Sequence, residues 1–286
     1  ESESRGLGDV YKRQFKVPIA EFGGVQEALS LMASDGYIAM ASTELMNAIV
    51  DNHEAPMVLS SIMKQNVTNR GRDIINHAMD VSGGAGISMG SSNYLGSAYM
   101  SFPIAITVEG ANIMTRSFQI IGQGLMRCHP HLLDVVEALQ SDSADAPANF
   151  MKGVKNMASH GATNFGRSVV AGVKDAVSLK GGEVGQMKPD AFVKLHEERL
   201  QRLSANFAVA ADLALLLGGR LKFEEMFMGR LADCIGAVFL GYGCLHHYAR
   251  THDKVDAGLQ RVAEHALLRL EAEAVSYTHL TLPTTD

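Results

Sequence analysis

Residues 203–217 read Leu203-Ser204-Ala205-Asn206-Phe207-Ala208-Val209-Ala210-Ala211-Asp212-Leu213-Ala214-Leu215-Leu216-Leu217, and this segment is apolar on nearly every side of a helix. A helix that is apolar all round is stable in water only where neighbouring elements cover it. We therefore expect a helix here that is buried between other helices.

Helical spacing of apolar side chains continues outward from this segment through most of the chain. Intervals of three and four residues predict two long helices before residue 83, through Val25, Leu29, Met32, Leu45 and Ile49, and then Ile62, Ile74, Ile75, Ala78 and Met79. A polar run at 51–53 and Pro56 separate them, and Gly83-Gly84 ends the second. Further helices are predicted at 151–179, 190–217, 221–250 and 255–273. Strand-type alternation is nearly absent, so the predicted fold class is all-α.

Composition and charge limit the classes of function. Of the 286 residues, 47% are hydrophobic and 20% are charged, which argues against disorder. The formal net charge of −6 gives no electrostatic case for nucleic acid, because proteins that bind it are usually strongly basic. No apolar run reaches the roughly 18 residues of a membrane span. The three cysteines, an odd number without a framework spacing, predict reduced thiols and a cytoplasmic protein. Peripheral contact with the inner membrane stays open.

A single carboxylate, Glu109, lies between an apolar run and a helical pattern. Residues 103–108 read as an extended apolar segment after a Gly/Ser-rich loop, and helical spacing resumes at Gly110. Burial against an apolar wall would raise the pKa of Glu109, whereas the dipole of a helix start would lower it, and a general base needs such a balance. The alternative interpretation is a glutamate that only complements the helix dipole.

Four motifs, in matching order over residues 15–130, resemble the acyl-CoA dehydrogenase family, particularly its large bacterial fatty-acid branch. The segment 107–116, Thr-Val-Glu-Gly-Ala-Asn-Ile-Met-Thr-Arg, resembles the catalytic segment, a Glu-Gly pair with an Arg seven residues after the Glu. Residues 80–87 resemble the Gly-Gly-x-Gly turn that approaches the FAD of a neighbouring subunit. Residues 15–19 resemble the start of the C-terminal helical bundle, and 127–130 resemble the segment after the catalytic helix.

The resemblance implies an FAD-dependent dehydrogenase of fatty acyl-CoA thioesters in β-oxidation. It implies Glu109 as the catalytic base, an electron-transfer acceptor and a homo-oligomer. It also implies cofactor contacts at four residues: Phe15, Gly83, Gly84 and Gly86. Ala111 and Ile113 depart from the Thr and Gln of many members, which puts those two flavin contacts in doubt. Arg116 is expected to be a structural partner or a cofactor neighbour.

The resemblance also divides the chain. It implies the family's C-terminal helical domain at 15–130 and the additional bacterial helical domain at 131–274, with a polar linker at 141–149. Residues 1–14 and 275–286 resemble translated sequencing-adapter tails, and we exclude them from fold reasoning. We expect the remainder to be a fragment of a longer enzyme, inactive by itself.

Two histidine-rich segments raise the question of a metal. Cys128-His129-Pro130-His131 supplies adjacent residues that cannot easily converge on one ion, and His246-His247 with His252 fits a polar helix end better. We therefore predict no metal site. Two alternatives to the dehydrogenase remain open: a helical packing or oligomerisation module without activity of its own, and an acyl-CoA oxidase, which uses the same Glu chemistry with oxygen as acceptor.

Overall fold

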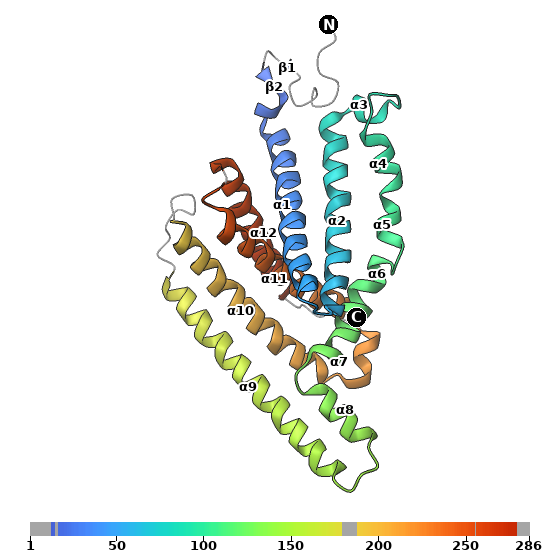
Figure 1. The fold of residues 1–286 in the computed structure, drawn as a ribbon, viewed down its shortest axis with the longest axis vertical. Helices are drawn as coiled ribbons and strands as arrows, with labels where there is room; N and C mark the ends of the chain where they lie inside the picture. The colour runs from blue at the N-terminus through green and yellow to red at the C-terminus, as the bar shows by residue number, and fades with distance from the viewer. Residues whose placement is uncertain (1–12, 15–16, 179–187, 255, 279–286) are drawn as a thin grey trace, which may run out of the picture.

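The computed structural model describes residues 13–14, 17–178, 188–254 and 256–278, and within these ranges the predicted all-α class is confirmed. The described strands are two residues each, β1 (Arg13–Gln14) and β2 (Val17–Pro18), paired antiparallel. A short 3₁₀ turn, η1 (Ile19–Glu21), leads into the helices shown in Figure 1. Phe15, a predicted cofactor contact, lies outside the described residues.

The two long helices predicted before residue 83 are present. Helices α1 (Gly23–Asp51) and α2 (Met57–Ser82) lie side by side in Figure 1 and pack against each other. Gly83 ends α2 with a φ of 57°, a conformation that glycine adopts without a steric penalty.

The predicted Gly/Ser-rich loop is present at residues 88–94, but the residues on either side of it, including most of the segment predicted to be extended at 103–108, are helical. They contain three short helices, α3 (Gly84–Ile87), α4 (Leu95–Ser101) and α5 (Pro103–Thr107). Asn93 accepts hydrogen bonds from the backbone N–H groups of Leu95 and Gly96, and this caps the start of α4. Pro103 occupies the first turn of α5, where its missing N–H costs nothing.

A π-helix continues the chain after the Glu109 segment. Helix α6 (Asn112–Met114) runs into the π-helix η2 (Thr115–Gln123), then into α7 (Gly124–Cys128) and α8 (Leu132–Gln140). The predicted linker at 141–149 is shorter than expected, because α9 (Ala146–Ser178) already begins at Ala146 and takes Pro147 into its first turn.

The remaining helices are α10 (Pro189–Leu215), the 3₁₀ segment η4 (Gly218–Phe223), α11 (Glu225–Thr251) and α12 (Ala257–Thr278). Figure 1 shows α9 at the edge of the molecule, with α10 between it and the other long helices. The prediction that residues 203–217 are buried between other helices is only partly correct. Leu203 and Ala214 are buried, but Leu213 and Leu216 are exposed near the end of α10.

Helix α11 lies at the centre of the packing. One cluster of buried apolar residues joins it to α1, α2, α10 and α12, and a second joins it to α2, the π-helix, α7 and α10. Both clusters combine residues from either side of position 130. The domain boundary proposed there therefore does not separate two cores, and the boundary itself stays a prediction.

Small residues allow the neighbours of α11 to approach closely. A Cβ placed on Gly243 would lie 2.9 Å from the Cα of Ser42, a backbone atom of α1. By length and composition α11 could span a membrane, yet 72% of its most apolar window is buried inside the protein. A central core helix satisfies the same criteria.

Buried charges also connect the long helices. Arg70 on α2 pairs with Asp35 on α1 and Glu273 on α12, each at 2.6 Å. Arg269 on α12 adds a contact of 3.2 Å to Asp35. This network joins three helices whose residues are up to about 240 positions apart in the sequence.

Candidate functional site

Glu109 lies in a strained connection between α5 and α6. Its φ is 53°, and that of Gly110 is 91°. A left-handed conformation is uncommon for a residue with a side chain and costs on the order of 1–3 kcal/mol, so it persists only where the surroundings enforce it. Glu109 therefore precedes α6 rather than occupying its first turn, and the predicted position at a helix start is wrong.

Lys64 on α2 binds the connection between α5 and α6 through three hydrogen bonds. Its Nζ donates hydrogen bonds to the backbone oxygen of Gly110 at 2.7 Å and to Asn112 Oδ1 at 2.6 Å. A third contact, at 3.3 Å, reaches the backbone oxygen of Ile106 in α5. One ammonium group thus fixes the end of α5, the turn and the start of α6.

Asn112 continues the same hydrogen-bond network inward. Its side chain is buried and donates to Thr68 Oγ1 and Asn69 Oδ1, each at 2.8 Å. Thr115 Oγ1 donates to the Gly110 oxygen at 3.1 Å, and a Cβ on Gly110 would come within 3.1 Å of Thr115 and of Gln119. The surroundings therefore enforce the backbone conformation of the Glu109 connection.

The carboxylate itself is exposed, and so are its apolar neighbours. Ile104, Val108, Ile113 and Met114 are all exposed, and Ile113 reaches 84% exposure. An exposed apolar patch beside a rigidly held carboxylate is typical of a surface that another part of a protein, or a ligand, covers. The exposed carboxylate of Glu109 thus has exposed apolar side chains on both sides of it in the sequence.

Arg116 has a structural partner. On the π-helix it forms a two-point ion pair with Asp233 of α11, in which Nε lies 2.7 Å from Oδ1 and a terminal nitrogen contacts Oδ2. Gly229 leaves room for the guanidinium, because a Cβ there would lie 2.7 Å from it. Arg116 thus connects the π-helix to α11, which agrees with the first of the two roles expected for it, that of a structural partner. A π-helix is rare and occurs frequently near functional sites.

The glycine turn at 83–86 lies far from Glu109. Nineteen residues of α2 separate Lys64 from Gly83, roughly 28 Å along a helix. Cβ atoms on Gly83 and Gly84 would meet nothing within 4 Å, so their backbone is open to a close approach by a ligand. Gly86 is buried, and a Cβ there would lie 3.2 Å from Met79 Sδ. The backbone is thus open at Gly83 and Gly84 and covered at Gly86, and all three stay predicted cofactor contacts.

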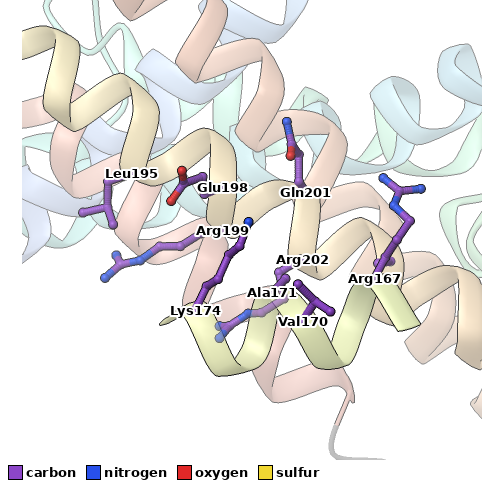
Figure 2. A pocket seen from close by; sticks show the side chains of 10 residues that line it. Arg167, Val170, Ala171, Lys174, Leu195, Glu198, Arg199, Gln201 and Arg202 are labelled. Atoms are coloured by element: carbon purple, nitrogen blue, oxygen red, sulfur yellow. The ribbon is translucent and has the colours of Figure 1, made fainter. Parts of the chain in front are cut away.

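A cationic cleft between α9 and α10 was not anticipated from the sequence. It holds about 280 Å³ and is shown in Figure 2, where Arg167 and Lys174 extend from α9 and Arg199 and Arg202 from α10. Glu198 is the acidic side chain of its lining, and Arg199 also contacts Glu271 at 3.2 Å. The charges converge only when two helices pack, so no local motif signals them.

Comparison with known proteins assigns both halves of the chain. Residues 11–126 match the family model described as acyl-CoA dehydrogenase, C-terminal domain, and residues 126–275 match acyl-CoA dehydrogenase, C-terminal, bacterial type. A solved structure of an acyl-CoA dehydrogenase complexed with FAD, from Bacillus anthracis, superposes with a TM-score of 0.64 at 15% identity. The match covers 95% of this chain and 44% of that one, so this chain spans less than half the length of that enzyme. On these matches, the chain belongs to the acyl-CoA dehydrogenase family.

Proposed function

We propose that the protein containing this chain is an FAD-dependent acyl-CoA dehydrogenase that oxidises fatty acyl-CoA thioesters, as in β-oxidation, and that Glu109 is its catalytic base. The observation that carries the proposal is the enforced left-handed backbone at Glu109, beside exposed apolar side chains. Strain of this kind, maintained by Lys64 and Asn112, is concentrated at functional sites. A glutamate serving only a helix dipole would need no such conformation.

Glu109 suits the removal of a proton from the carbon next to a thioester carbonyl. An ionised carboxylate offers only acceptors, and it becomes a stronger base when apolar groups exclude water from it. The exposed side chains of Ile104, Val108 and Ile113 are positioned in sequence to form part of such a cover. An acyl chain, the rest of the enzyme, or both would complete it.

The flavin would supply the redox step by accepting hydride from the β carbon of the thioester. Gly83 and Gly84 would allow its phosphate or ribose to approach the backbone, because no side chain blocks them. Since these glycines lie far from Glu109 along α2, they would serve a different active site from the one that this Glu109 serves. A homo-oligomer satisfies that requirement.

The decisive experiment replaces Glu109 by Gln in the complete enzyme. The exchange keeps the side-chain shape and removes the charge, so flavin and acyl-CoA should still bind. The rate of flavin reduction should fall by about 10² to 10⁴, the usual contribution of a positioned general base. Anaerobic mixing with an acyl-CoA, followed by flavin bleaching, measures this step directly.

Glu137, an exposed carboxylate on α8, provides the matched control. Glu137→Gln should bleach the flavin at the parental rate. Parental bleaching by Glu109→Gln would show that the base lies elsewhere. Oxygen consumption during turnover separates an oxidase from a dehydrogenase that uses an electron-transfer acceptor. A complete protein without bound flavin or bleaching would favour the helical-module alternative.

We also propose that helix α9 brings the protein to an anionic membrane surface from the cytoplasmic side. Its exposed side carries an apolar stripe at helical spacing: Met151, Val154, Phe165, Val169 and Val173. Over its whole length the helix contains four lysine or arginine residues and one acidic residue, Asp175, although the chain as a whole is acidic. Two of the four cations, Arg167 and Lys174, line the cleft toward α10. Apolar and basic side chains together are typical of helices that lie in a membrane interface.

Vesicle flotation tests this second proposal. The chain should float with vesicles containing anionic phosphatidylglycerol and much less with phosphatidylcholine alone, and added salt should weaken the association. The double variant Phe165→Asp/Val169→Asp should abolish flotation. The control Leu213→Asp, at an exposed leucine on α10, should not. If the double variant instead disrupts a dimer and the parent never floats, the stripe binds a second copy.

A further inference from the structure

A cluster of three imidazoles and one carboxylate lies where three segments meet. His129 and His131 belong to the connection between α7 and α8, His160 lies on α9 and Asp212 on α10. His129 Nε2 is 2.8 Å from Asp212 Oδ1, and His160 Nδ1 is 3.3 Å from Asp212 Oδ2. One potential ligand atom from each of these three residues lies within 4.8 Å of the others.

The three rings lie close together. Ring centroids are 5.1 Å apart for His129 and His160, 6.3 Å for His129 and His131, and 6.0 Å for His131 and His160, with planes at 72° to 82°. Steep angles of this kind exclude stacking of the rings on one another.

We propose that this cluster binds one divalent transition-metal ion of the zinc type, with His129, His160 and Asp212 as ligands and His131 or water in the fourth position. Tetrahedral Zn²⁺ takes imidazole nitrogen and carboxylate oxygen at about 2.0–2.2 Å, so its ligand atoms lie roughly 3.3 Å apart. The observed separations are 2.8 Å from His129 to Oδ1 of Asp212 and 3.3 Å from His160 to Oδ2, and one ligand atom from each of the three residues lies within 4.8 Å of the others, so small shifts would bring them to that spacing. Imidazole-rich sets favour zinc, copper or nickel over magnesium and calcium.

The surroundings suit a bound ion. The side chain of His129 is almost fully buried, and those of Asp212 and His160 are partly so. His129 and His160 also line a cavity of about 590 Å³ with mainly apolar walls, which gives an ion and a coordinated water a way in. Gly161 keeps α9 close, because a Cβ there would lie 3.2 Å from Asp212 Oδ2.

The competing arrangement is a hydrogen-bond network without metal. His129 Nδ1 accepts a hydrogen bond from the backbone N–H of His131 at 3.2 Å, which favours the tautomer with its proton on Nε2, facing Asp212. Asn164 Nδ2 lies 3.0 Å from His160 Nε2. An ion bound at His129 Nε2 would move the ring proton from Nε2 to Nδ1. Nδ1 could then no longer accept the hydrogen bond from the backbone N–H of His131.

The experiment uses the tag-free chain, stripped with a chelator and titrated with ZnCl₂ by calorimetry. One ion per chain should bind, with a dissociation constant in the micromolar range or below, and ZnCl₂ should raise the melting temperature, because the ion binds only the folded arrangement. Co²⁺ should give the visible absorption of a four- or five-coordinate site, and excess Zn²⁺ should remove it.

Variants locate the site. Asp212→Asn should weaken Zn²⁺ binding at least about tenfold, and His160→Gln, at the more exposed histidine of the pair, should abolish stoichiometric binding. His265→Gln, at an exposed histidine on α12, and Cys128→Ser should bind like the parent. Circular dichroism of each stripped variant checks folding. No stoichiometric binding by the parent, unchanged binding by both site variants, or loss of binding in either control would overturn the proposal.

Discussion

Helices α11 and α9 are both long and both rich in small and apolar residues, yet they have opposite surroundings. Helix α11 is covered by α1, α2, α10, α12 and the π-helix, whereas α9 packs mainly against α8 and α10 and exposes an apolar stripe. Apolar composition therefore does not by itself place a helix in the core. The difference lies in what covers each helix, and within the described residues no element covers the apolar stripe of α9.

The burial of α11 predicts that its thiols react differently from an exposed cysteine elsewhere in the chain. Burial raises the pKa of both α11 thiols, Cys234 and Cys244, to about 12, whereas Cys128 is exposed at the end of α7. Only the thiolate is nucleophilic, so a shift from 9.0 to about 12 lowers the reactive fraction about a thousandfold near pH 8.

A colorimetric thiol reagent at pH 8 should therefore label one cysteine rapidly in the native chain and three after denaturation. Cys128→Ser should remove the rapid phase. Rapid labelling of two or three thiols in the native protein would contradict the burial of α11.

The buried ion network gives the next largest effect. Arg70→Met leaves Asp35 and Glu273 without their main cation, and breaking a buried pair in this way costs about 3–5 kcal/mol of unfolding free energy. Arg250, an exposed arginine of α11 that pairs with Glu44 at 2.8 Å, is the control. Arg250→Met should cost no more than about 1 kcal/mol. Urea denaturation measures both, and equal losses would mean that the network is not buried.

Glycine substitutions should have opposite signs in the two helices. Gly243→Ala on α11 places a methyl group 2.9 Å from backbone of α1, and such overpacking costs about 1–3 kcal/mol. Gly166→Ala on α9 meets nothing within 4 Å, so the higher helix propensity of alanine should stabilise the protein by about 0.5–1 kcal/mol. Thermal denaturation monitored at 222 nm would reveal the difference, and two changes of the same sign would refute it.

The smallest effect concerns pH. A hydrogen bond with His247 of α11 lowers the pKa of Glu44 on α1 below its ordinary 4.5. A carboxylate whose pKa is lower in the folded state stabilises the fold above the unfolded value and loses that contribution as the pH falls through the folded value. Glu44→Gln should therefore reduce the loss of melting temperature below about pH 4.5. If the melting temperature below about pH 4.5 falls as steeply in the variant as in the parent, the Glu44–His247 pair does not contribute to stability.

Long periodic helices could be predicted from the sequence, but short ones could not. Helices α1 and α2 carry ten or more apolar positions at helical spacing, so one polar break and a glycine suffice to bound them. Helices α3, α4 and α5 are four to seven residues long. They are fixed by Asn93 as a cap, by Pro103 and by packing on α2, none of which produces periodicity.

The candidate site residues also fall into those that a local motif indicates and those that only the packing reveals. Glu109 could be chosen as a candidate because its motif is local, but its left-handed backbone depends on Lys64, 45 residues earlier. The histidine cluster was missed because its second half, His160 and Asp212, is separated from His129 by 31 and 83 residues. Neither residue lies in a spacing typical of metal ligands, so only the packing of α9 on α10 reveals the set.

The central position of α11 also affects how the chain is made on the ribosome. Helix α1 ends at Asp51 and α11 begins at Glu225, so the first helix is synthesised 174 residues before the one that covers it. At a translation rate of about 5–20 residues per second, the apolar face of α1 stays uncovered by α11 for roughly 10 to 35 seconds. During that interval α1 and α2 expose apolar side chains that can aggregate. The yield of folded protein should therefore depend on chaperones that bind nascent chains.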